Sequence, residues 1–356
     1  MDSLNICIIG GLPRAINSTG LQTLNESMAR QLAGMGHQVD VFIPLRRSPN
    51  ALQALQTLGR IDIPGVKISD VFDLESRKSQ SVEPVREAAL RFMLEPYDRV
   101  IISDVAMDFA RLVRAAGKGK AIILTHGMQC SPFDIWDGAE LKTHEAKYVC
   151  ISRAHYNEAV RLGFREQSVM IHVPAPDRPR EVAPASGRGI AIGSLCARKC
   201  YGDIARIAAA LRKPVDVYGD VQSAEVLALV EASPWLEYRG KLPHNELLEA
   251  VRGADFMIHT ARHEGFPVAV REAMSLGIPV IAWDISLYRD NGVDPAKNIL
   301  LPLRGDIKAA LAVADWKALR SIENRRALAK ETNEKYGPGA FAEKLAALLG
   351  NKIEEG

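Results

Sequence analysis

The sequence has no long hydrophobic run and almost no net charge, and both absences narrow the class of protein. No apolar run approaches the roughly 18 residues that a membrane-spanning helix needs, and the first residues lack the basic region of a secretion signal. We therefore expect a cytoplasmic protein. The 45 Lys and Arg against 43 Asp and Glu leave a formal net charge of +2, which is too small to indicate a polyanionic partner such as nucleic acid.

Cysteine is also scarce. Five cysteines in 356 residues with no export signal favour reduced thiols over a disulfide framework, and they are Cys7, Cys130, Cys150, Cys196 and Cys200. Cys196 and Cys200 lie close together, but a structural zinc site needs four ligands and no second Cys or His pair lies near them in sequence. We expect no metal and no cofactor. With 47% apolar and 25% charged residues, the composition also excludes a disordered chain.

A length of 356 residues favours two globular domains. Short apolar runs alternate with helical patterns, which predicts an α/β fold with parallel sheets. The strands expected in the first half are 4–9, 38–43, 66–71, 99–103, 121–125, 148–151 and 169–173, and those in the second half are 190–195, 215–218, 236–238, 256–260, 280–283 and 299–301. A proline-rich stretch, His172–Arg188, is interpreted as the linker. We therefore predict an N-terminal domain over 1–178, a C-terminal domain over 179–337, and a last helix within 338–352 that packs back onto the first domain.

The loop after the first strand joins a buried strand to a helix. Glycines Gly11 and Gly20 lie in this loop, and its backbone amides can hold an anion at the helix N-terminus. The glycine spacing is not that of a dinucleotide fingerprint, and a turn without a ligand is the alternative. His126 directly follows another expected strand, at the end where open parallel sheets bind ligands, but a lone histidine is a weak signal and by itself favours a structural or merely exposed residue.

The segment from His263 to Ala282 carries the strongest signal. Glu264 and Gly265 lie in the loop after a strand, Pro267 is suited to begin a helix, and Glu272 lies on that helix. Such a junction offers amide donors for a diphosphate and two carboxylates for sugar hydroxyls. The alternative is that Glu264 caps the helix and that Glu272 pairs with a surface Lys or Arg.

These residues resemble the retaining GT-B glycosyltransferases of the family 4 type, also called glycosyl transferases group 1. Glu264 and Glu272 match the E-x7-E signature of that family, and the following Glu-Ala-Met and Gly-Ile-Pro-Val run matches as well. The resemblance covers most of the chain and implies two Rossmann-like parallel-sheet domains facing across a cleft.

The resemblance also implies an activity, the metal-independent transfer of a sugar from a UDP or GDP sugar to an acceptor hydroxyl with retention of configuration. The acceptor would be a carbohydrate, a lipid-linked molecule or a small molecule. A lipid-linked acceptor would bring the protein into peripheral contact with the inner face of the membrane. Glu264 would contact the transferred sugar and Glu272 the ribose, and His126 would lie beside the donor sugar. The backbone near Gly265, Phe266, Pro267 and Val268 would approach the donor.

One departure concerns the phosphate-binding loop, which reads Gly193 to Cys200 here. Lys199 matches the family, but Ser194 stands where an arginine usually binds the diphosphate. Our hypothesis is that Arg198 supplies the second positive charge. A second departure is that no Gly-Gly-x-x-Glu segment follows Ala282.

Two other functions remain open from the sequence. An NADP-dependent oxidoreductase would use the first loop with Arg46 and Arg47, but it leaves the E-x7-E segment unexplained. A degenerate glycosyltransferase-like subunit that binds sugar nucleotides without transfer would explain Ser194.

Overall fold

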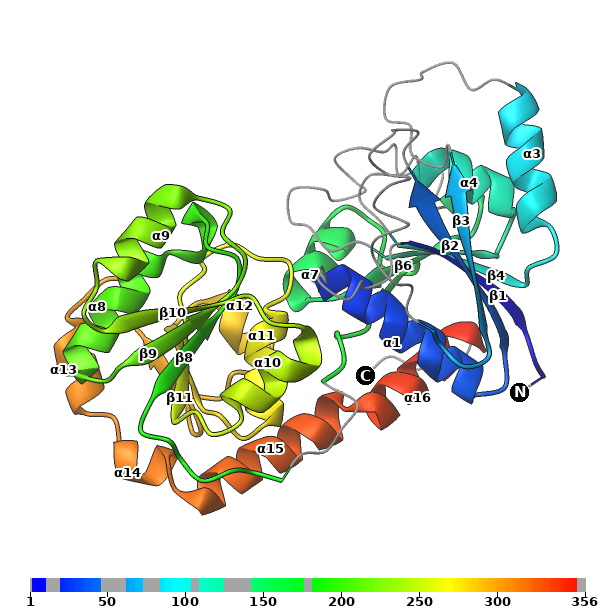
Figure 1. The fold of residues 1–356 in the computed structure, drawn as a ribbon. Helices are drawn as coiled ribbons and strands as arrows, with labels where there is room; N and C mark the ends of the chain where they lie inside the picture. Colours follow the sequence, from blue (N-terminus) through cyan, green and yellow to red (C-terminus); the bar gives the residue numbers. More distant parts are fainter. Residues whose placement is uncertain are drawn as a thin grey trace. The chain divides into compact units, whose positions relative to one another are not determined.

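The computed structural model describes residues 2–10, 20–45, 62–72, 84–103, 109–124, 142–175 and 181–350. The chain divides into two compact units, each with its own sheet (Figure 1). Unit 1 comprises Met1–Pro174 together with Pro338–Gly356, and unit 2 comprises Ala175–Gly337. The division after Pro174 lies earlier than the predicted boundary at residue 178. None of the described helices is both long and apolar enough to cross a bilayer.

Unit 1 is built on a parallel sheet in the order β3-β2-β1-β4-β5-β6-β7. Its strands are β1 (Asn5–Gly10), β2 (Gln38–Leu45), β3 (Val66–Phe72), β4 (Arg99–Ser103), β5 (Ala121–Leu124), β6 (Lys147–Cys150) and β7 (Ser168–Met170). Its helices are α1 (Gly20–Gly34), α3 (Pro84–Leu94), α4 (Phe109–Ala116), α7 (Arg153–Arg161) and α16 (Pro338–Leu349). The inner strands are buried almost throughout, as expected for a parallel sheet covered on both faces.

Helix α16 completes the core of unit 1 from the far end of the chain. It lies along α1, as Figure 1 shows, and its apolar side chains Phe341, Leu345 and Leu348 are 2–3% exposed. They meet Leu24 and Met28 of α1 around a small apolar cavity. The preceding helix, α15 (Ile322–Tyr336), belongs to unit 2, so the chain passes between the units at Gly337.

Unit 2 repeats the same topology with one strand fewer, in the order β10-β9-β8-β11-β12-β13. Its strands are β8 (Gly189–Ile192), β9 (Val215–Tyr218), β10 (Leu236–Gly240), β11 (Phe256–His259), β12 (Val280–Trp283) and β13 (Ile299–Leu301). Its helices, besides α15, are α8 (Tyr201–Leu211), α9 (Ala224–Glu231), α10 (His244–Val251), α11 (Val268–Ser275), α12 (Ser286–Arg289), α13 (Ile307–Ala312) and α14 (Trp316–Leu319), with a 3₁₀ turn over Ala197–Lys199.

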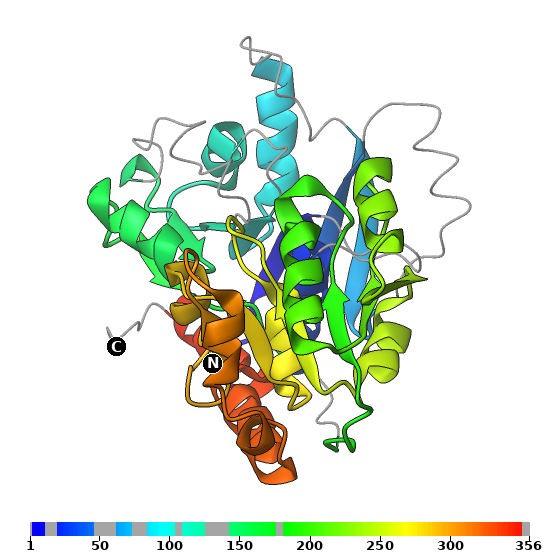
Figure 2. The same cartoon turned by 90° about the vertical axis from the view of Figure 1, so that its left-hand side faces the viewer.

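Helices cover both faces of the unit 2 sheet. Helices α8 and α9 lie on one face and α10 and α11 on the other (Figures 1 and 2). The strand order reverses between β8 and β11, which are neighbours in space. In open α/β sheets such a reversal opens a crevice at the carboxyl ends of the two strands. The loops after β8 and β11 are therefore where the fold places a ligand.

The first residues of the predicted linker, His172–Arg188, are packed against the rest of the protein. Val173 and Ala175 are 1% and 3% exposed, and the Ala175 amide donates to the Tyr336 carbonyl at 2.7 Å. The first residues after His172 thus pack into the units instead of running free between them.

Candidate active site

The loop after β8 is shaped by two glycines and by hydrogen bonds to its carbonyls. Gly193 has a φ of +149°, and a Cβ on it would lie 2.9 Å from Cε of Lys199. Gly219, at the end of β9, has a φ of +154° and approaches so closely that a Cβ would lie 2.0 Å from the Gly193 oxygen. The Tyr201 hydroxyl donates to that same oxygen at 2.7 Å. Only glycine fits these two positions, and the result is a loop that lays the Lys199 side chain across Gly193.

The loop after β11 contacts the loop after β8 through a hydroxyl group. The Thr260 hydroxyl lies 3.0 Å from the Lys199 carbonyl and 3.1 Å from the Cys200 carbonyl. Its single hydrogen is shared between these two acceptors. Cys200 has a left-handed backbone with a φ of 54°, and α8 begins at the next residue. Two segments about 60 residues apart are thereby held in contact at the switch point of the sheet.

An ion cluster lies where these two loops meet. Glu264 is 8% exposed, its Oε1 pairs with Nζ of Lys199, and it also accepts from Nη1 of Arg198 at 3.1 Å. Burial by itself would raise the pKa of Glu264, but the charge and hydrogen bond of Lys199 and the charge of Arg198 lower it. The structure therefore brings two of the predicted catalytic residues, Arg198 and Lys199, into contact with a third, the ionised Glu264.

Glu272 lies farther along α11 and has a different partner. It is 7% exposed, and its Oε1 is 2.8 Å from Nε2 of His244, the first residue of α10. The alternative interpretation of the two glutamates does not hold here, because Pro267 is the N-cap residue of α11 without a side-chain cap and Glu272 pairs with histidine. The sequence offered no signal for His244, which lies 28 residues away at the start of another helix.

The turn that leads into α11 carries the predicted donor-binding backbone. The Val268 amide donates to the Phe266 carbonyl at 3.0 Å, so this amide already has an acceptor within the turn. Phe266 is 8% exposed, and its ring centroid lies 5.1 Å from the guanidinium of Arg271. Gly265, half-buried, directly follows Glu264.

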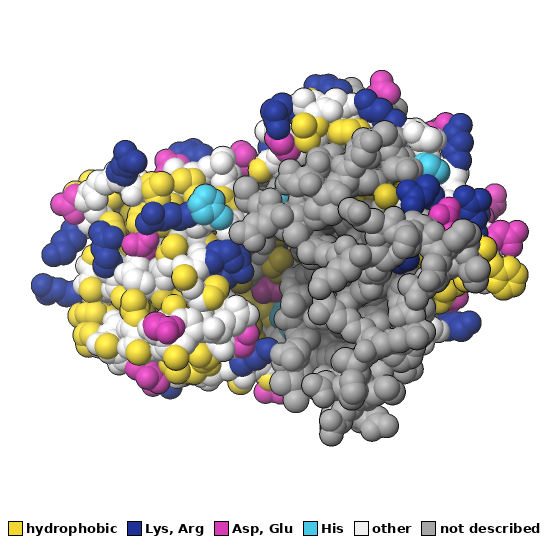
Figure 3. Space-filling model, turned by 90° about the horizontal axis from the view of Figure 1, so that it is seen from above, with side chains coloured by type: hydrophobic (Ala, Val, Ile, Leu, Met, Phe, Trp, Pro, Cys, Tyr) yellow, Lys and Arg dark blue, Asp and Glu magenta, His cyan; other side chains and the backbone are white. Residues whose placement is uncertain are grey.

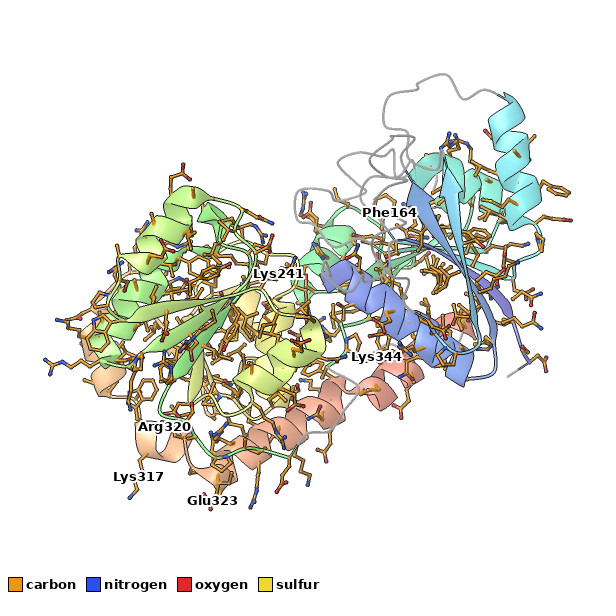
Figure 4. The ribbon with its side chains drawn as sticks, viewed as in Figure 1. Phe164, Lys241, Lys317, Arg320, Glu323 and Lys344 are labelled. Carbon is orange, nitrogen blue, oxygen red and sulfur yellow. The ribbon has the colours of Figure 1, made fainter. Side chains whose placement is uncertain are left out.

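Ser194 faces an anion. Its hydroxyl donates to Oδ1 of Asp220 at 2.7 Å, and Gln222 donates to Oδ2 at 3.1 Å. Burial would raise the pKa of Asp220, yet these hydrogen bonds and the charge of Lys241 lower it. Figure 4 shows Lys241 just beyond β10. The positive charge of the loop after β8 itself resides on Arg198 and Lys199.

Several predicted residues are not part of this cluster. His126, Gly11, Arg46 and Arg47 lie outside the described residues, and Gly20 is the first residue of α1 in unit 1. Near the start of that first loop, the buried Ser103 hydroxyl donates to Oδ1 of Asn25 at 2.6 Å.

A metal site would need several ligating side chains close together. Within the described ranges, no three His, Cys, Asp or Glu side chains are grouped closely enough to hold a metal ion. Figure 3 shows Lys and Arg intermixed with Asp and Glu on the visible described surface, which agrees with the small net charge.

Comparisons with known proteins show what this chain is similar to. Residues 228–335 match the model of the family described as glycosyl transferases group 1. A GDP-mannose-dependent α-mannosyltransferase of Mycobacterium tuberculosis is 30% identical over 112 residues, which are 32% of this chain and 29% of that protein. The aligned segment thus spans less than a third of that relative's length.

Solved structures match over nearly the whole chain. The pneumococcal O-GlcNAc transferase GtfA, solved with UDP and GlcNAc, has a TM-score of 0.71 at 12% identity and covers 99% of this chain and 100% of its own. Anabaena HepE, solved with UDP, has a TM-score of 0.70 at 11% identity over 98% of this chain and 100% of its own. Identities this low show a shared fold. Residues 228–335 are therefore similar to the glycosyl transferases group 1 family, and the chain as a whole has the fold of the GT-B glycosyltransferases.

Proposed function

We propose that the protein is a retaining glycosyltransferase that uses a nucleotide-diphosphate sugar, with UDP or GDP as the nucleotide. The observation that carries the proposal is the cluster of Arg198, Lys199 and Glu264 at the carboxyl ends of β8 and β11. Two cations beside a buried carboxylate suit a substrate that joins a diphosphate to a hydroxyl-rich sugar. UDP in the matching structures of GtfA and HepE supports a nucleotide ligand.

The proposed role of each residue comes from the family resemblance and is compatible with its chemistry. Lys199 and Arg198 would neutralise the charge that develops on the departing diphosphate, which is the largest electrostatic demand of the reaction. Glu264, kept ionised by these cations, would accept a hydrogen bond from a hydroxyl of the transferred sugar. Glu272 would accept from the ribose. In a front-face reaction the leaving phosphate itself takes the proton of the acceptor hydroxyl, so no further base is required.

The acceptor is assigned to unit 1 by the family resemblance, with His126 beside the donor sugar. The proposed acceptors are a carbohydrate, a lipid-linked molecule or a small molecule.

A second function, nucleotide-sugar binding without transfer, is favoured by one observation. Ser194 stands where an arginine usually contacts the diphosphate, and its hydroxyl donates to the carboxylate of Asp220, so the loop after β8 supplies one cation fewer. Transfer then depends on whether Arg198 compensates.

The experiment that decides is a panel of UDP and GDP sugars, scored for hydrolysis and for transfer to simple acceptors, with the anomeric configuration of any product determined by NMR. Wild type, Arg198→Ala and a control, Arg206→Ala, are compared. Arg206 is an exposed arginine on α8 that pairs with Asp203 and has no contact with Glu264. Transfer by the wild type with loss in Arg198→Ala alone supports the proposal, binding without turnover supports the second function, and a product of inverted configuration refutes retention.

A further inference from the structure

His259 is a buried histidine that the proposed reaction does not use. It is the last residue of β11 and is 3% exposed. Its Nδ1 lies 2.9 Å from the hydroxyl oxygen of Tyr288, and its Nε2 lies 3.4 Å from Nζ of Lys199 and 3.8 Å from Oε2 of Glu264. One ring nitrogen therefore faces the cation of the donor site and the other faces a tyrosine.

The hydrogen bonds of Tyr288 fix which nitrogen carries the proton. The Tyr288 hydroxyl lies 2.7 Å from the Ala261 carbonyl and 3.0 Å from the His259 carbonyl. Carbonyl oxygens only accept, so the single hydroxyl hydrogen points to them, and the hydroxyl oxygen is left to accept from Nδ1 of His259. Nδ1 therefore carries the hydrogen and Nε2 presents a lone pair.

That lone pair faces a group that can only donate. The Lys199 ammonium has three hydrogens and no acceptor capacity, so it donates to Nε2 of His259 as well as to Glu264. A charged imidazolium would disrupt this arrangement. Burial first, then the neighbouring charges of Lys199 and Arg198, lower the pKa of His259 to about 4 against the partial opposition of Glu264, so the ring is neutral at neutral pH.

We propose that His259, held in its Nδ1–H form by Tyr288, is a positioning residue that aims Lys199 at the diphosphate of the donor. The inference rests on the proposed function, since it assumes that Lys199 binds that diphosphate. A neutral acceptor suits this task, because it directs the ammonium without competing for its charge. When Lys199 exchanges Glu264 for a phosphate oxygen, its bond to His259 remains and limits the motion of the side chain.

The test uses Tyr288→Phe, which removes the acceptor of the Nδ1 hydrogen and adds no atom. The matched control is Tyr97→Phe, which likewise removes one tyrosine hydroxyl, here one that donates to Asp40 in unit 1. Titration calorimetry measures the affinity of the full chain for UDP and for GDP, at a temperature at which thermal melts show every variant folded. We expect Tyr288→Phe to weaken nucleotide binding about three- to tenfold, as for one lost hydrogen bond, and Tyr97→Phe to leave it unchanged.

Nitrogen-15 NMR of histidine-labelled protein reads the tautomer directly. The His259 signal, assigned by its loss in His259→Gln, is expected to show a protonated Nδ1 and a bare Nε2 between pH 8 and pH 5.5. His259→Gln keeps a side-chain acceptor for Lys199, so it should bind nucleotide more tightly than His259→Leu.

The outcomes separate the inference from the function beneath it. A hydrogen on Nε2 in the wild type, or equal nucleotide affinity in Tyr288→Phe and wild type, overturns the role of His259 while the proposed function stands. A wild-type chain that binds no nucleotide diphosphate overturns the proposed function and this inference together.

Discussion

Acidification between pH 7.5 and pH 5 should weaken unit 2 through His259. The ordinary pKa of histidine is 6.5, and burial lowers that of His259 to about 4. Below pH 6.5 the unfolded chain takes up a proton at this position and the folded chain does not, so stability falls as the pH drops, until the folded histidine protonates near pH 4. Linkage gives a loss of about 2 kcal/mol by pH 5 and about 3 kcal/mol in full.

Glu264 acts in a lower pH range. Its folded pKa lies below the unfolded value of 4.5, so its contribution to stability is present above pH 4.5 and is lost as the pH falls further. His37 and His155 of unit 1 also have pKa values lowered by burial. The measurement must therefore report on unit 2, and tryptophan fluorescence does so, since three of the four tryptophans, Trp235, Trp283 and Trp316, lie there.

The assay is urea unfolding of the full chain at pH 7.5 and pH 5, followed by tryptophan fluorescence. Wild type is compared with His259→Gln, which cannot take up the proton, and with His263→Gln, the same change at an exposed position four residues on. Wild type and His263→Gln should lose about 2 kcal/mol more than His259→Gln. An equal loss in all three proteins would refute the assigned state of His259.

Three further substitutions test the donor loops. Lys199→Met should weaken UDP or GDP binding roughly 10- to 100-fold in calorimetry, the effect of losing a charged hydrogen bond, and unchanged affinity would remove Lys199 from the site. Glu264→Gln should lower the rate of sugar transfer by roughly 100-fold or more. The same variant should bind the free nucleotide at least as tightly as wild type, because the carboxylate that competes for the two cations is gone. Weaker nucleotide binding would contradict this competition. Gly219→Ala should destabilise unit 2 by about 2 kcal/mol or more, since its Cβ would meet the Gly193 carbonyl at 2.0 Å, and an unchanged urea midpoint would show that the loops can yield.

The sheets could be predicted from the sequence because their strands are short buried apolar runs. The final strand was expected at 299–301 and is found there. The strand expected over 190–195 ends at Ile192, because Gly193 leaves the extended conformation and the loop turns toward β9. Apolar content alone gave no sign of that turn.

Helix α15 was not predicted from the sequence, because its buried face is partly polar. Its buried face includes Arg325 and Thr332 alongside Leu328, Ala329 and Tyr336, so it has no continuous apolar stripe. Arg325 is 1% exposed and donates to the carbonyls of Gly277 and Ala254, contacts that no local pattern reveals.

The candidate site also contains residues that the sequence predicted and residues that it did not. Glu264 and Lys199 were predicted from the resemblance of their segments to the motifs of a known family. In the structure both follow strands whose carboxyl ends meet at one edge of the parallel sheet. His259 and Tyr288 could not be predicted, since an isolated histidine ending an apolar strand has no characteristic spacing and its partner comes 29 residues later.

The geometry of the ion cluster suggests how donor binding and sugar contact are coupled. In the structure as it stands, Arg198 and Lys199 both pair with Glu264, so the carboxylate is already held by two cations. In the proposed reaction a diphosphate draws the two cations away, and the buried carboxylate then lacks its partners, a state that is costly unless another donor replaces them. A sugar hydroxyl is such a donor. The diphosphate and the sugar should therefore be recognised together, with Glu264 exchanging its bonds to cations for a bond to the group that is transferred.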